Sequence, residues 1–256
     1  MAPRKQPRVF LWDLDDTLMW TSWAYSRAFS KFHDYLLELF DYRLIELRTL
    51  GTLSEQIDKE LIRAENPDTG KPYGYGMERF PTSLGKTYEW LCEHGYGEHR
   101  ELVSRRIKMI GMEAFDPLGY KQQGLVKGAR ETLDYIREQG DVQVLITKGE
   151  VLVQDYKIVA LDLDRWFDEE IYIVDSKNKE TFEEHQRRFP RSRMYSVGNS
   201  YPSDVQPALE AGINAIYIPY YTWLGEGSDV EINPARVLQL RKVEEIIGLY
   251  KAGILA

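Results

Sequence analysis

The sequence predicts an α/β fold in which a parallel sheet is interrupted by a mainly helical insertion. From about residue 120 onward, short apolar runs of strand length alternate with amphipathic stretches, which is the order of a parallel sheet with crossover helices. One more apolar run, 9–12, stands alone near the start of the chain. The hundred or so residues between show helical periodicity and no buried strand.

The composition is that of an ordinary globular protein. The chain has 256 residues, 43% of them hydrophobic and 29% charged, which is enough for one large domain or two modest ones. A formal net charge of -8 argues against a nucleic-acid surface, because phosphate backbones attract basic proteins. Cys92 is the single cysteine and no apolar stretch has membrane-spanning length. We expect a cytoplasmic protein that binds neither nucleic acid nor membrane, of an oligomeric state that the sequence leaves open.

The first expected strand, 9–12, ends in two carboxylates. Residues 13–17 read Asp-Leu-Asp-Asp-Thr. Open α/β sheets bind ligands beyond the carboxyl ends of their strands, which places Asp13 and Asp15 at a candidate site. Two carboxylates this close stay ionised beside a cation, and their hard oxygens suit Mg²⁺. A solvated turn explains the pentapeptide equally well.

Residues 18–120 are expected to form the helical insertion, which has the size of a small domain. Apolar residues from Trp23 to Leu47 indicate one or two long helices, with Trp23 on the core-facing stripe. Thr52 and Glu55 have capping-box spacing before a further helix. Two more helices are expected at 83–92 and 98–112, with a loop at 66–80. This insertion is a candidate lid.

Four further strands are expected at 142–147, 171–174, 194–198 and 215–219. Before the first of them, Ala129, Leu133 and Ile136 fall on one helical face, and Gly140 is a stop signal for that helix. The expected organisation is therefore a sheet domain formed by 1–17 and 121–256, with 18–120 inserted into it.

The ends of these strands carry polar residues. The strand at 142–147 ends in Thr147 and Lys148, which offer a hydroxyl and helix-start amides to an anion. Lys177 follows the next strand, and Asn199 and Asp204 follow the one after that. Acids, a hydroxyl and an ammonium are thus expected at one sheet edge.

In this chain order, the strand ends resemble the four motifs of the haloacid dehalogenase superfamily of phosphotransferases. The first motif is Asp13 to Thr17, the second an apolar strand ending in Thr147, the third Lys177, and the fourth Asn199 with Asp204. The superfamily's helical cap, when it lies between the first two motifs, is similar in place and size to 18–120. The resemblance implies a Rossmann-like, three-layer core of parallel sheet with an inserted, mainly α-helical cap.

The resemblance also implies an activity, that of a Mg²⁺-dependent phosphatase acting on a small phosphorylated metabolite. Asp13 would be the nucleophile that forms an aspartyl-phosphate, while Asp15 protonates the leaving group and then deprotonates water. An acid at Asp15 favours phosphoryl transfer over dehalogenation, because a halide needs no proton. Mg²⁺ would be held by the Asp13 carboxylate, the Asp15 backbone carbonyl and Asp204. The residues expected to contact the phosphate are Thr147, Lys148, Lys177 and Asn199.

Several alternatives stay open at this point. A phosphomutase has the same motifs, and a non-catalytic phosphate-binding or regulatory homologue is motivated by Asn199, where many relatives carry Asp. Lys179 competes with Lys177 for the third motif, although the spacing to Phe182 favours Lys177. A two-component receiver domain also has acids, a Thr and a Lys at strand ends, but the large insertion argues against it.

Two features lie outside the motifs. Trp20 and Trp223 are expected near the cleft and are candidates for substrate selectivity. Residues 162–164 repeat the Asp-Leu-Asp of the first motif but follow an amphipathic helix instead of a buried strand, so we expect a loop there. The substrate itself is not readable from the sequence.

Overall fold

The computed structural model describes residues 7–41, 46–167, 170–220 and 235–255. Its strands are β1 (Arg8–Trp12), β2 (Glu65–Asn66), β3 (Lys71–Pro72), β4 (Val142–Lys148), β5 (Ile171–Val174), β6 (Arg193–Gly198), β7 (Asn214–Tyr217) and β8 (Val237–Gln239). Its helices are α1 (Thr21–Leu39), α2 (Leu47–Leu61), α3 (Arg79–Glu93), α4 (Glu101–Met112), α5 (Pro117–Gln123), α6 (Ala129–Glu138), α7 (Val151–Leu161), α8 (Asp164–Phe167), α9 (Lys179–Arg188), α10 (Gln206–Glu210) and α11 (Glu245–Lys251). Two short turns are the 3₁₀ turn η1 (Glu113–Phe115) and the π turn η2 (Tyr201–Val205).

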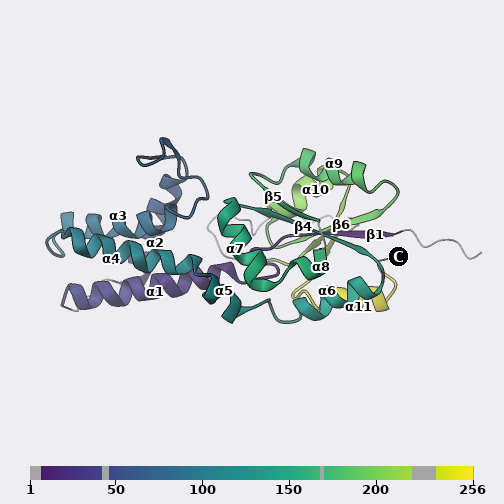
Figure 1. Ribbon diagram of the computed structural model, residues 1–256, viewed down its shortest axis with the longest axis horizontal. Coiled ribbons are helices and arrows are strands. Elements are labelled where there is room, and N and C mark those ends of the chain that lie inside the picture. Colours follow the sequence, from purple (N-terminus) through teal and green to yellow (C-terminus); the bar gives the residue numbers. More distant parts are fainter. Residues whose placement is uncertain (1–6, 42–45, 168–169, 221–234, 256) are drawn as a thin grey trace, which may run out of the picture. The chain divides into compact units, whose positions relative to one another are not determined.

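The chain divides into two compact units (Figure 1). The sheet unit consists of Met1–Ser22 and Gln123–Ala256, and the helical unit is the continuous stretch Trp23–Gln122. No helix among the described residues is long and apolar enough to cross a membrane.

The sheet unit contains a parallel sheet, whose described strands have the order β5-β4-β1-β6-β7-β8. Strand β1 pairs with β4 on one side and with β6 on the other. The α/β fold predicted from the sequence is therefore confirmed. Strand β8 was not predicted, because a three-residue strand gives no periodicity.

Helices cover both faces of the sheet. Successive side chains of a strand point to opposite faces, and β1 is buried throughout, so both of its faces need a covering layer. Val9 and Leu11 of β1 pack with Phe182 of α9 in one apolar cluster. On the other face, Phe10 stacks on Tyr250 of α11, with ring centroids 5.9 Å apart. In Figure 1, α9 and α10 lie on one side of the sheet, and α6 and α11 on the other. The sheet unit is thus a three-layer α/β structure.

The helical unit has its own core, formed by residues of α1 to α4 such as Phe32, Leu84 and Ile107. Inside it, the Arg79 guanidinium of α3 forms a buried ion pair with Asp58 of α2 at 3.1 Å.

Some local predictions for the helical unit are wrong. Trp23 is 41% exposed, whereas the sequence placed it on the core-facing stripe; Ala24 and Ala28 occupy that face instead. The Thr52 hydroxyl donates to the Arg48 carbonyl within α2, so the expected capping box is not a helix start. The expected loop at 66–80 contributes to the small hairpin of β2 and β3.

The repeated Asp-Leu-Asp at 162–164 is only partly a loop. Asp162 ends α7 in the left-handed conformation with φ +54°, and Asp164 begins the short helix α8. The buried side chains of Leu163 and Trp166 fix this turn. The prediction of a loop did not consider that Leu163 and Trp166 would be buried, and this burial explains why the segment is partly helical.

Candidate active site

The carboxyl edge of the sheet brings the motif residues together. Because β1 lies between β4 and β6, the residues that follow these strands emerge side by side, where the strand order reverses. Asp13 follows β1, Thr147 belongs to the end of β4, and Asn199 follows β6. The segment after β5 adds Lys177.

The turn after β1 is held by its own backbone. The Asp13 amide continues the ladder by donating to the Val197 carbonyl at 2.9 Å, and the Leu14 carbonyl then accepts from three amides of the next five residues. Asp16 has φ +58°, a left-handed conformation that Asp tolerates. Its carboxylate accepts from the backbone amide of Ser22 at 3.0 Å and from the Ser22 hydroxyl at 2.6 Å. The turn is thereby tied to the start of α1.

Asp13 and Asp204 converge on the Lys177 ammonium. Lys177 Nζ donates to Asp13 Oδ1 at 2.5 Å and to Asp204 Oδ1 at 2.7 Å. All three side chains are buried. A cation between two carboxylates offsets the repulsion that would otherwise separate them.

The competing lysine, Lys179, is elsewhere. It is exposed and pairs with Glu183 along α9. Helix α9 begins after Asn178, whose side chain accepts from the Thr181 amide at 3.0 Å in a capping box. Lys177 therefore lies just before the helix, and its side chain enters the site.

Glycine at position 198 allows Asp204 to approach the sheet. A Cβ at Gly198 would lie 2.2 Å from Asp204 Oδ2, so no other residue fits without displacing the acid. The same carboxylate accepts from the Ser200 amide at 3.0 Å, and the Ser196 hydroxyl donates to the Asp204 carbonyl at 2.7 Å. Asp204 is thus fixed from its side chain and from its backbone.

Thr17 connects the first and fourth motifs. Its hydroxyl contacts Asp13 Oδ2 at 2.9 Å and Asn199 Oδ1 at 3.2 Å. Asn199 therefore has a hydrogen-bonding role that its amide oxygen performs as an acceptor.

Thr147 offers an unused hydroxyl. Its side chain is fully buried, and its Oγ1 has no hydrogen-bond partner among the residues that the structure describes. Buried polar groups are normally paired, so this hydroxyl is suited to a ligand oxygen. The neighbouring Lys148 is half-buried at the end of β4.

Asp15 lies in a different set of contacts from Asp13. Lys157 of α7 forms an ion pair with Asp15 Oδ1 at 2.7 Å, and the Thr21 hydroxyl bonds the same oxygen. Gln154 Nε2 donates to Asp15 Oδ2 at 3.0 Å. The two acids two residues apart thus each have their own ammonium.

Electrostatics separate the two acids further. Burial raises the pKa of Asp13 to about 7 against the opposing attraction of Lys177, and the charges of Asp204 and Asp15 add to the rise. For Asp15, burial also acts to raise the pKa, but the Lys157 ion pair and the hydrogen bonds outweigh it and hold the pKa below its ordinary value. For Lys177, burial acts to lower the pKa, but Asp13 and Asp204 outweigh it and raise the pKa.

The oxygen donors at this edge fit Mg²⁺. In the parts of the chain that the structure describes, no group of three or more His, Cys, Asp or Glu side chains is arranged as metal ligands. Mg²⁺ needs fewer, since it takes one or two carboxylates and completes its shell with waters and phosphate oxygens. Asp13 and Asp204 already converge on one cation, the Lys177 ammonium.

The predicted aromatic pair is only partly described. The Trp20 ring packs on Tyr220, with centroids 4.4 Å apart, and its carbonyl accepts from Gln123. Trp223 lies outside the described residues.

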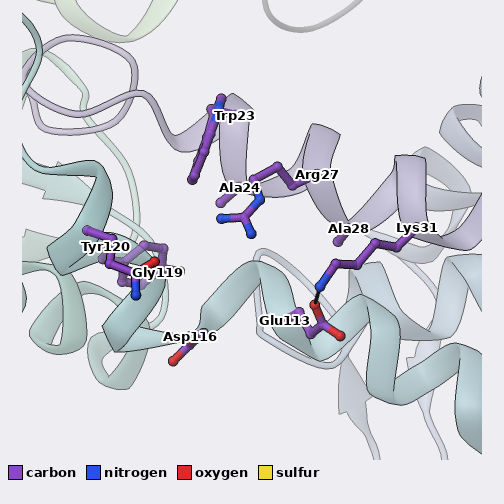
Figure 2. A pocket seen from close by; sticks show the side chains of 10 residues that line it. Trp23, Ala24, Arg27, Ala28, Lys31, Glu113, Asp116, Gly119 and Tyr120 are labelled. Carbon is purple, nitrogen blue, oxygen red and sulfur yellow. Dashed lines mark hydrogen bonds and ion pairs between the residues drawn. The ribbon is translucent and has the colours of Figure 1, made fainter.

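The helical unit contains a cleft of its own, between α1 and the segment from η1 to α5 (Figure 2). The Arg27 guanidinium lies 4.5 Å from the centroid of the Trp23 ring, and Lys31 forms an ion pair with Glu113. Most of the charged side chains at this cleft are exposed, and we assign it no function.

Three contributing residues were not predicted from the sequence: Gln154, Lys157 and Thr21. Gln154 and Lys157 are three positions apart on the buried face of α7, beside Val153, Ile158 and Leu161. Polar residues at core positions of a helix were the available signal. Their partner, Asp15, is 142 residues from Lys157 in the chain, so the pairing itself was not visible.

Solved structures with the same fold cover 96–97% of the chain. A haloacid dehalogenase-like family hydrolase from Xanthomonas campestris matches with TM-score 0.68 and 24% identity, over 97% of this chain and 96% of that one. YfnB from Bacillus subtilis, described as a HAD-hydrolase bound to magnesium, matches with TM-score 0.59 and 20% identity, over 96% and 100%. A 2-haloacid dehalogenase from Pseudomonas syringae matches with TM-score 0.55 and 18% identity, over 96% and 99%. No protein-family sequence model and no curated protein sequence matches the chain.

Proposed function

Since the chain has the fold of the haloacid dehalogenase-like hydrolases, we propose that it is a Mg²⁺-dependent phosphatase that acts on a small phosphorylated metabolite. The observation that carries the proposal is the buried Asp13, held by Lys177 and Thr17 at the end of β1, with the neighbouring strand β4 ending in a Thr147 hydroxyl that has no partner among the described residues. A nucleophilic carboxylate, a fixed ammonium and free hydrogen-bond capacity are what an incoming phosphoryl group requires.

Asp13 is the nucleophile in this proposal. One of its oxygens attacks phosphorus and forms an aspartyl-phosphate while the ester oxygen leaves. Charge on the phosphoryl oxygens is offset by Lys177, and the Thr147 hydroxyl donates to one of them. Lys148 and Asn199 are proposed as further phosphate contacts, with Trp20 and Trp223 as elements of selectivity.

Asp15 is the acid and base. It donates a proton to the leaving oxygen and afterwards accepts one from the water that hydrolyses the aspartyl-phosphate. A halide leaving group needs no such proton. The presence of an acid at position 15 therefore favours phosphoester hydrolysis over dehalogenation, the activity named for the P. syringae structure.

The Asp13 and Asp204 carboxylates and the Asp15 backbone carbonyl are the proposed Mg²⁺ ligands. When bound, the ion supplies positive charge that keeps Asp13 ionised and neutralises the phosphoryl oxygens. The helical unit is proposed as the cap that excludes water and selects the substrate.

The test is phosphate release by the purified protein with MgCl₂, from sugar phosphates, nucleotides and phospholipid headgroup esters. Asp13→Asn is the blank, and we expect it to remove all turnover. Asp162→Asn is the matched control, because it makes the same change in the second Asp-Leu-Asp, where Asn also tolerates the left-handed backbone.

The outcomes separate the candidates. Mg²⁺-dependent phosphate release that Asp13→Asn abolishes and Asp162→Asn preserves supports the phosphatase. Halide release from 2-haloacids without phosphate release would indicate a dehalogenase instead of a phosphatase. Transfer of the phosphate to a second hydroxyl would indicate a mutase. No turnover in a folded, Mg²⁺-loaded protein across the panel contradicts the proposal.

A further inference from the structure

Helix α7 presents two polar side chains to Asp15 from an otherwise apolar buried face. We propose that Lys157 and Gln154 are positioning residues that fix the Asp15 carboxylate so that Oδ2, and not Oδ1, gives and takes the proton. This inference rests on the proposed phosphatase function and assigns the proton to an atom.

The Oδ1 atom of Asp15 has no lone-pair position left for another hydrogen-bond donor. Each oxygen of an ionised carboxylate offers about two lone-pair positions. Lys157 Nζ occupies one on Oδ1 at 2.7 Å, and the Thr21 hydroxyl occupies the other. A proton can reach Oδ1 only if one of these donors leaves. The Lys157 side chain is 3% exposed, so it has no water to turn to.

Among the described residues, the Oδ2 atom accepts from one donor, which leaves one of its two lone-pair positions open. That donor is Gln154 Nε2, at 3.0 Å, and the same nitrogen donates to the Lys148 carbonyl at 3.1 Å. Both acceptors lack hydrogens, so the amide nitrogen must face them. The carboxylate plane is thereby set by a buried group that is itself anchored to β4.

Two costs in the structure indicate that this arrangement is selected for the site and not for stability. Gln154 Oε1 is buried with no hydrogen-bond partner in the described parts of the chain, while its Nε2 donates to two acceptors. Gly149, the residue directly after β4, has φ +152°, and a Cβ there would lie 2.6 Å from Gln154 Nε2. The backbone makes room for the Gln154 amide.

The partners of Asp15 are also distinct from those of Asp13. Asp13 bonds Lys177 and Thr17, whereas Asp15 bonds Lys157, Thr21 and Gln154. Lys157 therefore offsets the Asp15 charge without involving the lysine that serves the nucleophile. Removal of Lys157 should affect the proton donor and leave the nucleophile in place.

Asp15 loses one proton and regains one proton in each catalytic cycle. In the first step a bond forms between an Asp13 oxygen and phosphorus, the ester P–O bond breaks, and the Oδ2 proton of Asp15 moves to the leaving oxygen. In the second step water attacks phosphorus, the bond from Asp13 to phosphorus breaks, and the water proton returns to Oδ2.

The experiment compares two leaving groups in wild type and in Lys157→Met. An alkyl phosphate needs a proton on its leaving oxygen, whereas p-nitrophenyl phosphate releases a stable anion. We expect Lys157→Met to lower kcat/KM for the alkyl ester about 100-fold and for the aryl ester less than about fivefold. The matched control is Lys179→Met, an exposed lysine with an ordinary surface pair. It should leave both values unchanged.

A second background separates positioning from general damage. In Asp15→Asn, addition of Lys157→Met should change kcat/KM for the alkyl ester less than about threefold, because residues acting as a unit are non-additive. Gln154→Met should show the same leaving-group split, with a smaller loss. Circular dichroism verifies folding, and Lys157→Gln, which keeps one donor, replaces Lys157→Met if that variant is unfolded.

The outcomes test the role of Lys157 and Gln154 separately from the proposed phosphatase function. No wild-type turnover overturns the proposed function and the inference with it. Wild-type turnover with an equal loss for both esters in Lys157→Met, or additive losses in the Asp15→Asn background, overturns the inference alone. A split confined to the alkyl ester and absent in Asp15→Asn supports it.

Discussion

At the scale of single residues, the site is defined by which polar atoms are satisfied and which are not. Asp13 and Asp15 have separate ammonium partners, whereas the Thr147 hydroxyl has no hydrogen-bond partner in the described part of the chain. A buried hydroxyl without a partner costs stability, since it has given up its water. A ligand oxygen would supply the missing bond.

Thr147→Val therefore should have opposite effects on stability and on binding. We expect the free energy of unfolding to rise by about 1 kcal/mol, because an unpaired hydroxyl is replaced by a methyl of the same shape. The KM for a phosphomonoester should rise about tenfold or more, because a bond to a charged oxygen is lost. Urea titration and steady-state kinetics measure the two effects.

The control for Thr147→Val is Thr132→Val in α6. Thr132 is equally buried, but its hydroxyl donates to the Gly128 carbonyl at 2.7 Å. The same substitution there should lower the free energy of unfolding by about 1 kcal/mol and leave KM unchanged. A loss of stability in Thr147→Val comparable to that in Thr132→Val contradicts the prediction.

The residues of the site were predictable to different degrees. Asp13, Thr147, Lys177 and Asp204 follow or end strands, and parallel strands bring such ends to one edge. The choice of Lys177 over Lys179 was open, because only the side-chain packing shows which ammonium is buried. Lys157 was missed, since periodicity alone assigns a lysine in a helix to the surface.

At the scale of elements, strands that are apolar throughout were the most predictable. Strand β1 (Arg8–Trp12) and β5 (Ile171–Val174) agree with the expected runs to within one residue. Strands β2, β3 and β8 have two or three residues, too few for an alternating pattern. Their positions depend on pairing with other strands, which the residues of the strand alone do not predict.

Helix α9 contains a buried histidine whose charge should make stability depend on pH. His185 packs edge-on against Tyr172 of β5, with ring centroids 4.7 Å apart, and is 4% exposed. Burial lowers the pKa of His185, opposed by the charges of Glu184 and Glu170 and assisted by Arg188. The folded protein therefore takes up this proton less readily than the unfolded chain.

The sign of the effect follows from this difference. Above the unfolded pKa of about 6.5, His185 is neutral in both states and adds no pH dependence to the free energy of unfolding. As the pH falls below about 6.5, the unfolded state gains the proton first, and the free energy of unfolding declines by up to about 1.4 kcal/mol per pH unit. His185→Phe should lack this contribution. The wild type minus His185→Phe difference, from urea titrations between about pH 5 and 8, isolates it from other titrating groups.

The control is His94→Phe, at the exposed end of α3. It should retain the wild-type decline at low pH. A wild type minus His185→Phe difference that is constant over the whole range would show that His185 does not titrate between the two states.

At the scale of the whole molecule, the two units differ in how far apart in the chain their contacting residues lie. The helical unit is one continuous stretch with its own core. The sheet unit is discontinuous, and its central strand β1 is joined to its partners only across that stretch. Asp13 is 164 residues from Lys177, and Thr17 is 182 residues from Asn199. Closing such long loops precedes any gain from the contacts they bring.

We therefore expect the candidate site to be the last part of the protein to form. In refolding from urea with pulsed hydrogen exchange and mass spectrometry, peptides from α3 (Arg79–Glu93) and α4 (Glu101–Met112) should gain protection before peptides from β1 (Arg8–Trp12). The contacts of α3 with α4 join residues close in the chain, whereas β1 must find both β4 and β6. Recovery of Asp13-dependent turnover should follow protection of β1 and not that of α4. Simultaneous protection of all three segments would show that the two units fold as one cooperative body.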